Sequence, residues 1–291
     1  MHLPRSRAMR LGLWLPLTLV LACGLSACAS ADGARQPERW PQRLEALLPA
    51  DALLLGEQHD VPEHQRLQRE AVQWLAARRQ LAAVVIEMAE RGRSTAGLPR
   101  TATEAEVQAA LQWQDAAWPW KAYGPVAMAA VAAGVPVLGG NLPRSDMRAA
   151  MADPAWDRHL GAPALERQYA ALREGHCGLL PEAQIAPMAR IQIARDASMA
   201  RAVQEAARPG QTVLLVAGGG HVLRSLGVPT HWPEDFTSKV ALAQTGQAPA
   251  AIESEADLVV ATPAPAPRDH CADLRQQWGA QGRAKGGPAP P

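Results

Sequence analysis

The alternation of short apolar runs with longer amphipathic segments constrains this chain more than any other feature of its sequence. None of the apolar runs alternates apolar with polar residues, which is typical of strands buried on both faces of a sheet. The pattern therefore predicts a layered α/β domain with a largely parallel central sheet flanked by helices. The predicted strands are residues 52–55, 83–88, 135–138, 212–217, 239–243 and 258–261.

The segments between these runs carry helix signals. Asp60, followed by Val-Pro-Glu, provides an N-cap with proline and glutamate in the first turn, and predicts a helix to about residue 79. Further helices are predicted over residues 123–134, 163–173 and 181–207. Because no linker-like stretch or repeat interrupts this series, we expect one domain over residues 41–278. The Pro-, Ala- and Gly-rich residues 279–291 predict a disordered tail.

The first 27 residues have the features of an export signal. Three arginines precede an apolar run over residues 11–22, which is too short to span a membrane. The run is followed by Leu-Ser-Ala-Cys28, which resembles the lipobox of bacterial lipoproteins and implies cleavage before Cys28 and its acylation. A simple secretory signal, cut after Ala27 or Ala31, is the alternative.

The residue that follows the lipobox cysteine indicates the destination of such a lipoprotein. It is Ala29, not the aspartate that typically retains lipoproteins in the inner membrane. The resemblance therefore implies lipid anchoring to the outer membrane, on its periplasmic face, with residues 28–40 as the tether.

The export signal also decides how the four cysteines are interpreted. Only Cys177 and Cys271 remain once the signal is removed and Cys28 is acylated. Two cysteines in an oxidising compartment more often pair than stay free, so we predict a disulfide between them. The alternatives are two unpaired thiols, or metal ligands, since His176 and His270 directly precede these cysteines.

Charge and missing motifs exclude several classes of protein. Lys and Arg number 29 against 28 Asp and Glu, a net charge of +1, which argues against a nucleic-acid binder. The sequence has no Cys-x-x-Cys-His, so covalent attachment of c-type haem is excluded. It also lacks the Gly-x-Ser-x-Gly and phosphate-loop motifs.

Residues with catalytic or metal-binding chemistry follow the predicted strands. Two Gly-x-x-His motifs end on His59 and His221, and Glu87 ends the second strand. Because ligands bind beyond the carboxyl ends of parallel strands, we expect these three residues to converge in one cleft, with Glu57 and Asn141 on its rim. His59, His221, Glu57 and Glu87 would suit a divalent transition metal, or a general base with its orienting partner. Alternatively, the two histidines only cap helices by bonding local backbone.

A set of short segments in matching order carries a resemblance to the ChaN family of haem-binding uptake lipoproteins. That family belongs to the superfamily of Tiki, TraB and the erythromycin esterases, and the resemblance covers residues 53–243. The segments are Leu54-Leu-Gly-Glu-Gln-His-Asp60, His64 and Gln68, Val85-Ile-Glu-Met88, Trp120-Lys-Ala-Tyr-Gly-Pro125, Gln192-Ile-Ala-Arg-Asp196, Met199-Ala200, Ala217-Gly-Gly-Gly-His221 and Gly227-Val-Pro229.

The resemblance implies an α/β fold, haem or iron binding for uptake, and a homodimer formed around haem. The superfamily is also marked by paired Gly-x-x-His motifs and a glutamate, which correspond to His59, His221 and Glu87. In Tiki these positions belong to a proposed metalloprotease, and in the esterases they act in hydrolysis. A metal-dependent or His/Glu-based hydrolase, with Arg195 as a further catalytic residue, is therefore the alternative function.

Aromatic residues are the candidates for haem contacts. Tyr123 and Tyr169 are the only tyrosines, and a phenolate can serve as an axial haem ligand. Tyr123 follows Trp113, Trp118 and Trp120, an aromatic cluster suited to contact a porphyrin face. Alternatively, Tyr123 is a core residue with a bonded hydroxyl.

Helical spacing makes two further positions candidates for the site. His64 and Gln68 share a helix face, so His64 could complete the ligand set around haem or a metal, or could be exposed in the first turn. Arg195 and Asp196 are adjacent on one helix and point about 100° apart, so only one can face a given spot. We expect Arg195 to pair with Glu57 or Glu87 or to hold a ligand carboxylate; a structural ion pair is the alternative.

Overall fold

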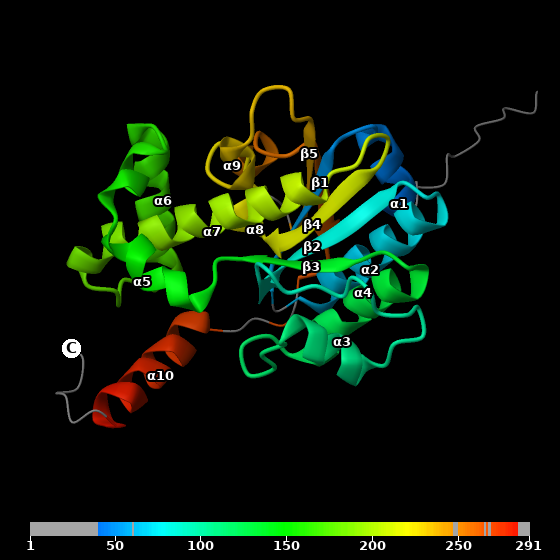
Figure 1. Ribbon diagram of the computed structural model, residues 1–291. Helices are drawn as coiled ribbons and strands as arrows, with labels where there is room; N and C mark the ends of the chain where they lie inside the picture. Colours follow the sequence, from blue (N-terminus) through cyan, green and yellow to red (C-terminus); the bar gives the residue numbers. More distant parts are fainter. Residues whose placement is uncertain (1–39, 60, 247–249, 265, 267–268, 285–291) are drawn as a thin grey trace, which may run out of the picture. The chain divides into compact units, whose positions relative to one another are not determined.

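The computed structural model describes residues 40–59, 61–246, 250–264, 266 and 269–284. All six predicted strands form and make one sheet in the order β3-β2-β4-β1-β5-β6, with every neighbouring pair parallel (Figure 1). The α/β fold class is therefore confirmed. The strands are β1 (Ala52–Glu57), β2 (Leu81–Glu90), β3 (Val137–Asn141), β4 (Thr212–Gly218), β5 (Ser238–Thr245) and β6 (Leu258–Thr262).

Helices cover both faces of this sheet. Along β1, Leu53 and Leu55 point into a core covered by α2 (Pro62–Ala77) and α4 (Trp120–Ala133). Leu54 points to the opposite face, into a second core with residues of α7 (Ile185–Ala206). Burial on both faces explains why β1 and β4 are apolar without alternation.

The four predicted helices are present, with shifted ends. The first, α2, has Val61 as its N-cap and no side-chain cap, and the expected cap Asp60 lies outside the described residues. The second, α4, begins at Trp120, before the predicted start, and ends at Gly134, which adopts the left-handed conformation (φ 77°). The third is α6 (Ala162–Gly175), and the fourth comprises η3 (Glu182–Gln184) and α7.

Several further helical segments were not predicted. The longest, α10, crosses the expected domain end at residue 278 and continues to Ala284, because alanine, glutamine and arginine favour helix there despite two glycines. The predicted tail therefore starts too early, and residues 285–291 lie outside the described part of the chain. The segments are α1 (Trp40–Arg43), η1 (Leu44–Leu47), α3 (Glu104–Leu111), α5 (Arg144–Ala152), η2 (Pro154–Arg158), α8 (Gly219–Val222), η4 (Val228–His231), α9 (Ala250–Glu253) and α10 (His270–Ala284).

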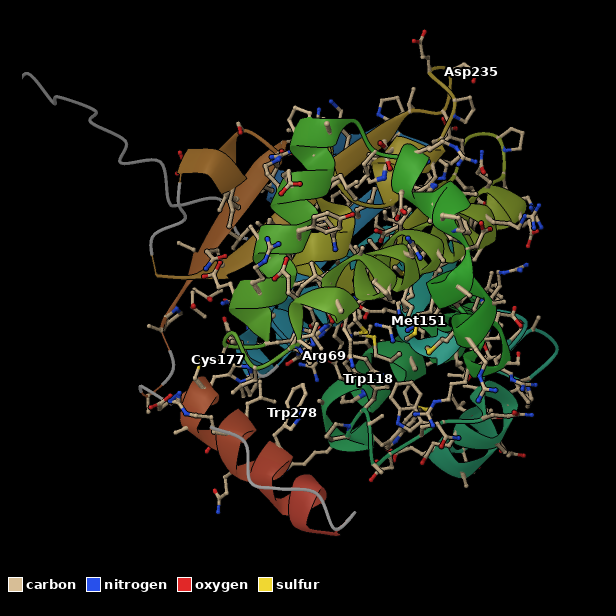
Figure 2. The ribbon with its side chains drawn as sticks, turned by 90° about the vertical axis from the view of Figure 1, so that its left-hand side faces the viewer. Arg69, Trp118, Met151, Cys177, Asp235 and Trp278 are labelled. Atoms are coloured by element: carbon tan, nitrogen blue, oxygen red, sulfur yellow. A yellow bond between two sulfur atoms is a disulfide. The ribbon has the colours of Figure 1, made fainter. Side chains whose placement is uncertain are left out.

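A disulfide fixes the start of α10. Cys177, in the loop after α6, and Cys271 are bonded, with their Cα atoms 5.6 Å apart. Trp278 of α10 packs against a small apolar cluster with Leu172 of α6 and Ile185 of α7 (Figure 2). The disulfide and the Trp278 contact therefore both attach the last helix to the rest of the domain.

No helix among the described residues has the length and apolar character needed to cross a membrane. The expected export signal, the lipidated Cys28 and the tether up to residue 39 lie outside the described residues.

Candidate functional site

Three side chains from separate strand ends meet at the carboxyl edge of the sheet. Glu87 of β2 lies between the two Gly-x-x-His histidines: its Oε2 is 3.7 Å from His59 Nε2, and its Oε1 is 3.5 Å from His221 Nε2. The backbone N–H of Gly218 also donates to Glu87, at 2.7 Å. A Cβ on Gly218 would come within 2.7 Å of His59 Nε2, so glycine permits this close approach.

Asp196 of α7 holds His221 from the other side. Its Oδ1 is 2.6 Å from His221 Nδ1, and its side chain is buried. His221 therefore has a carboxylate at each ring nitrogen. Asp196 was not among the predicted site residues, although a signal existed: it lies on the apolar stripe of α7 with Ile193, Met199 and Val203.

Glu57 lines the same cavity as His59 and His221, and its side chain is fully buried. Its carboxylate faces His59 Nδ1 at 2.7 Å and accepts hydrogen bonds from Tyr123 Oη (2.7 Å), Gln65 Nε2 and Gln68 Nε2 (both 2.6 Å). Both oxygens thus have partners within the protein, so a metal-ligand role for Glu57 would require this hydrogen-bond network to open. Glu57 instead fixes the orientation of the His59 ring.

Charges across the cluster are mutually stabilising. Burial alone would raise the pKa of Glu87, but His221, His59 and the Gly218 N–H outweigh it and lower this pKa to about 2. Burial alone would lower the pKa of His221, but Glu87 and Asp196 raise it to about 10. At neutral pH the core of the site is therefore a carboxylate beside an imidazolium.

The two flanking groups are shifted as well. Burial raises the pKa of Asp196 to about 6, against the opposing effect of His221. For His59, burial lowers the pKa, but its hydrogen bond to Glu57 and the charge of Glu87 raise it overall. Proton uptake by the site is thus spread over four groups that face one another.

A cavity of about 470 Å³, which we call the imidazole cavity, opens on the histidine side of Glu87. His59 and His221 line it together with the glycine-rich turn over residues 218–220. On the facing side it is lined by Leu172 of α6 and by His176, which immediately follows α6.

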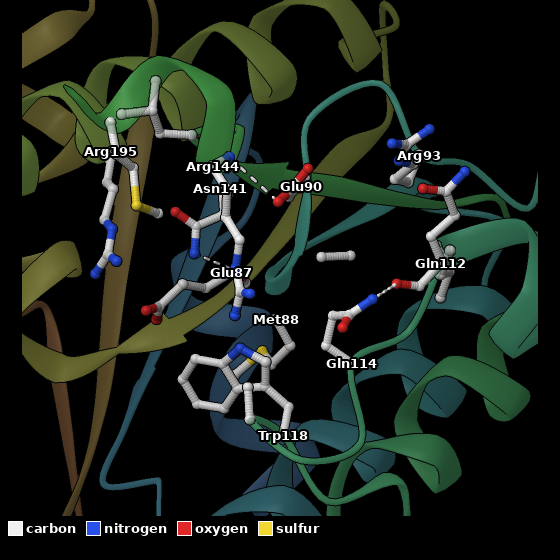
Figure 3. A pocket seen from close by; sticks show the side chains of 15 residues that line it. Glu87, Met88, Glu90, Arg93, Gln112, Gln114, Trp118, Asn141, Arg144 and Arg195 are labelled. Carbon is white, nitrogen blue, oxygen red and sulfur yellow. Dashed lines mark hydrogen bonds between the residues drawn. The ribbon is translucent and has the colours of Figure 1, made fainter. Parts of the chain in front are cut away.

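A second cavity, of about 390 Å³, which we call the arginine cavity, is lined by Glu87 itself. Arg93, Arg144 and Arg195 line it as well, with Trp118 and Met88 among its apolar residues (Figure 3). The Glu87 carboxylate also faces His59 and His221, which line the imidazole cavity.

Two of the aromatic residues predicted to contact haem, Tyr123 and Trp120, are buried. Tyr123 is 4% exposed and donates its hydroxyl to Glu57, while burial and the Glu57 charge raise its pKa. Trp120 is also buried and donates its indole N–H to Glu104 at 2.8 Å. Trp118 is the aromatic residue that packs edge-on against His59, with ring centroids 4.8 Å apart. Tyr123 is therefore a core residue with a bonded hydroxyl, which was the alternative prediction.

Two other candidates lie away from the cluster. His64 is fully buried, so the exposed alternative is wrong; its Nδ1 accepts from the Gln58 N–H and its Nε2 contacts Thr262 Oγ1 at 2.9 Å. Tyr169 packs beside Leu172 on α6 and lines neither cavity.

Arg195 lines the arginine cavity, as its expected role near Glu87 requires. However, no ion pair joins it to Glu57 or Glu87 within the described residues, so the expected pairing is wrong. Its neighbour Asp196 points away from that cavity toward His221, as the 100° rotation between adjacent helical residues demands.

The described residues contain no group of three or more His, Cys, Asp or Glu side chains arranged to hold a metal ion. The expected four-residue ligand set is instead an internally bonded network, because Glu57 is saturated by four donors and His221 is bonded to Asp196.

The fold and the site define a class of protein: a parallel α/β domain in which two Gly-x-x-His turns meet a buried glutamate at one edge of the sheet. Within that class, the chain belongs to the family described as haem-binding uptake, Tiki superfamily, ChaN, whose model matches residues 43–231.

One solved structure has the same fold. The chain is similar to the ChaN of Campylobacter jejuni in a structure of cofacial heme binding, with 21% identity and a TM-score of 0.61 over 78% of this chain and 93% of that one. It is also similar to the type III effector HopBA1, with 16% identity and a TM-score of 0.41 over 74% and 88% of the two chains. No curated protein matches the sequence.

Proposed function

We propose that this protein binds haem in the imidazole cavity at the carboxyl edge of the sheet. Its family is that of haem-binding uptake proteins, and the solved ChaN that shares its fold binds heme. A cavity of about 470 Å³ with an apolar wall and a few polar groups is typical of small-molecule and cofactor sites.

The observation that carries this proposal is His176 Nε2, which has no hydrogen-bond partner among the described residues. Nδ1 of the same ring lies 2.8 Å from the backbone oxygen of Leu172, so that nitrogen donates and Nε2 is left as an acceptor. A backbone carbonyl or a carboxylate on the second ring nitrogen is the usual support of a metal-ligating histidine. In the other two imidazoles of the cavity, His59 and His221, the Nε2 atom faces the Glu87 carboxylate, at 3.7 and 3.5 Å. His176 is therefore the residue of this cavity best suited to ligate haem iron.

Titration of the full chain with haem tests this function. We expect a saturable absorption spectrum of bound haem, altered in His176→Ala. His270→Ala is the matched control, because His270 also precedes a cysteine of the same disulfide but lines neither cavity. An unchanged spectrum in His176→Ala, with loss in Tyr169→Phe, would move the iron ligand to α6. Absence of saturable binding by the wild type would reject the function.

The same proposal places the protein on the periplasmic face of the outer membrane, anchored through acylated Cys28, where it would receive haem or iron for uptake. Its support is the lipobox sequence and the Cys177–Cys271 disulfide, which suits an oxidising compartment. Membrane fractionation of wild type and Cys28→Ser tests it. Release of the variant, together with an acylated N-terminal peptide in the wild type, is the expected result; an unmodified N-terminus beginning at Ala29 contradicts it.

We further propose that the protein forms a homodimer around haem, because the ChaN relative binds heme cofacially. Light scattering of the chain before and after addition of haem should show the molar mass doubling. A mass that stays constant at saturating haem would contradict the dimer and leave haem binding untouched.

A second function, hydrolysis, is favoured by the Asp196–His221–Glu87 geometry. The imidazolium of His221 could donate a proton to a leaving group, and Arg195 could stabilise developing negative charge. His59, oriented by Glu57, would accept a proton from water. Hydrolysis of p-nitrophenyl acetate, with and without added Zn²⁺ or EDTA, tests both the metal-dependent and the metal-free form. Activity that is equal in wild type and Glu87→Gln would reject this site.

A further inference from the structure

A groove between the N-terminal halves of α2 and α4 is lined by cations and by no carboxylate. The two helices lie side by side on one face of the sheet (Figure 1). The groove has a volume of about 340 Å³, and we call it the proline groove. The imidazole and arginine cavities, in contrast, are each lined by carboxylates. The residues that line the proline groove are Pro62, Gln65, Arg66, Arg69, Pro119, Lys121, Ala122 and Pro125.

Two of the three cations in this groove have no acidic partner among the described residues. Arg66 is paired with both Glu63 and Glu70, so its charge is already balanced. Arg69 and Lys121 make no ion pair in this part of the chain. Arg69 Nε is also shielded from solvent and lacks a hydrogen-bond acceptor among the same residues. Because shielded polar groups normally have a partner, Arg69 indicates an anionic ligand in the groove.

The rest of the groove selects an anion with an organic part. The amide nitrogen of Gln65 donates to Glu57 at 2.6 Å inside the protein, and the other walls are proline and alanine. Guanidinium and ammonium groups bind phosphate through charge-assisted hydrogen bonds, and apolar walls favour contact with carbon. A phospholipid combines both parts, in its phosphate and in the glycerol carbons next to it.

The expected tether places α2 close to a lipid surface. Trp40, the first described residue after the tether, donates its indole N–H to the backbone oxygen of Leu67 in α2, at 2.8 Å. The chain from Cys28 to Trp40 spans at most about 40 Å when fully extended. An acyl group on Cys28 would therefore keep the helix that carries Arg69 within that distance of the membrane.

We propose that Arg69 and Lys121 bind the phosphate of an anionic phospholipid in the membrane to which acylated Cys28 anchors the chain. The inference rests on the proposed lipid anchor and adds a second, non-covalent contact with the same membrane. A tether alone leaves the domain free to rotate, whereas two contacts turn α2 and α4 toward the lipid.

Vesicle sedimentation tests the groove separately from the anchor. Every protein compared is the full chain with Cys28→Ser, so none carries an acyl group and the other N-terminal residues are the same in all. Phosphatidylcholine vesicles are compared with vesicles that also contain phosphatidylglycerol, and we expect stronger binding to the second kind. Arg69→Gln and Lys121→Gln should each weaken that binding about fivefold, because each basic residue beside an anionic lipid surface contributes about that factor.

Arg148→Gln is the matched control, because Arg148 is an exposed residue of α5 that lines none of these cavities. It removes the same charge and should bind as the unsubstituted groove does. Lys121 is exposed, so its variant keeps the fold intact if Arg69→Gln proves unstable.

Three results would overturn the assignment. They are equal binding to both kinds of vesicle, an equal loss in Arg148→Gln and the two groove variants, and binding of soluble glycerol phosphate without any preference for phosphatidylglycerol. Acylation of Cys28 is measured on the N-terminal peptide of the wild type, and haem binding by its spectrum. Failure of the groove is therefore distinguishable from failure of the anchor or of haem binding.

Discussion

Replacing Tyr123 with Phe removes one hydroxyl from the centre of the site and leaves its packing in place. That hydroxyl donates to Glu57 Oε1 at 2.7 Å inside the protein. A hydrogen bond to a charged group stabilises a fold by about 1.5–3 kcal/mol. Because His59, Gln65 and Gln68 still serve the same carboxylate, we expect the lower part of that range, about 1.5–2 kcal/mol.

In a domain of this size each kcal/mol shifts the melting temperature by roughly 2–4 °C, so Tyr123→Phe should melt about 3–8 °C below the wild type. Thermal and urea unfolding followed by circular dichroism measure the change. Tyr169→Phe is the control, since Tyr169 makes no hydrogen bond to the site among the described residues and its loss should change stability by less than about 0.5 kcal/mol. The haem spectrum should be the same in Tyr123→Phe and wild type, because the hydroxyl is bonded inward. Equal stability of the two tyrosine variants, or loss of the haem spectrum in Tyr123→Phe alone, would refute the reasoning.

Other predictions concern charge, the disulfide and a close backbone contact. The pKa of His221 is about 10 in the fold, above its unfolded value of 6.5, so its contribution to stability is complete below pH 6.5 and is lost as the pH rises through 10. We expect a loss on the order of 4 kcal/mol in urea titrations across that window. Reducing Cys177–Cys271, which closes a separation of 94 residues, should lower the unfolding free energy by about 4–5 kcal/mol. In Gly139→Ala the new Cβ would lie 2.1 Å from the Glu90 backbone oxygen, so circular dichroism should show loss of the fold or strong destabilisation.

Matched control variants test each of these three predictions. The pH-dependent loss should disappear in His221→Gln, and its persistence there would assign it to other groups. A Cys177→Ser, Cys271→Ser chain should behave like reduced wild type; full stability of that double variant would contradict the disulfide estimate. Gly161→Ala, where a Cβ meets nothing within 4 Å, should fold normally.

The sheet and the meeting of its strand ends were predictable from the sequence because both follow from local pattern and parallel geometry. Runs such as residues 212–217 are apolar without alternation, and only strands buried on both faces require that. Once these strands are parallel, residues that directly follow them share one edge, which is why His59, Glu87 and His221 were expected together.

Which residues surround and support the site depends on tertiary packing, and local sequence patterns do not encode that packing. Trp120 and Tyr123 both lie on α4, but their contacts, Glu104 and Glu57, come from distant parts of the chain. His64 resembles an exposed first-turn residue, and is buried because β6 supplies Thr262 next to its ring. The tertiary arrangement alone decides which polar side chains are buried in the domain.

Two missed features did have local signals. Thr103 and Glu106 form a reciprocal cap at the start of α3, and the Thr-x-x-Glu spacing is its sequence signature. Asp196 occupies a position on the apolar stripe of α7, and a charged residue on such a stripe needs a buried partner. Applied to every helix, these two rules would have found α3 and the carboxylate that holds His221.

The covalent link at Cys177–Cys271 also has a mechanical consequence. The chain between these cysteines contains β4, β5 and β6, and β6 is an edge strand of the sheet. A pulling force applied at the C-terminus is transmitted through the bond to Cys177 and bypasses all three strands. The edge strand β6 therefore stays shielded from load, and rupture must begin in the chain that precedes Cys177, where α6 lies.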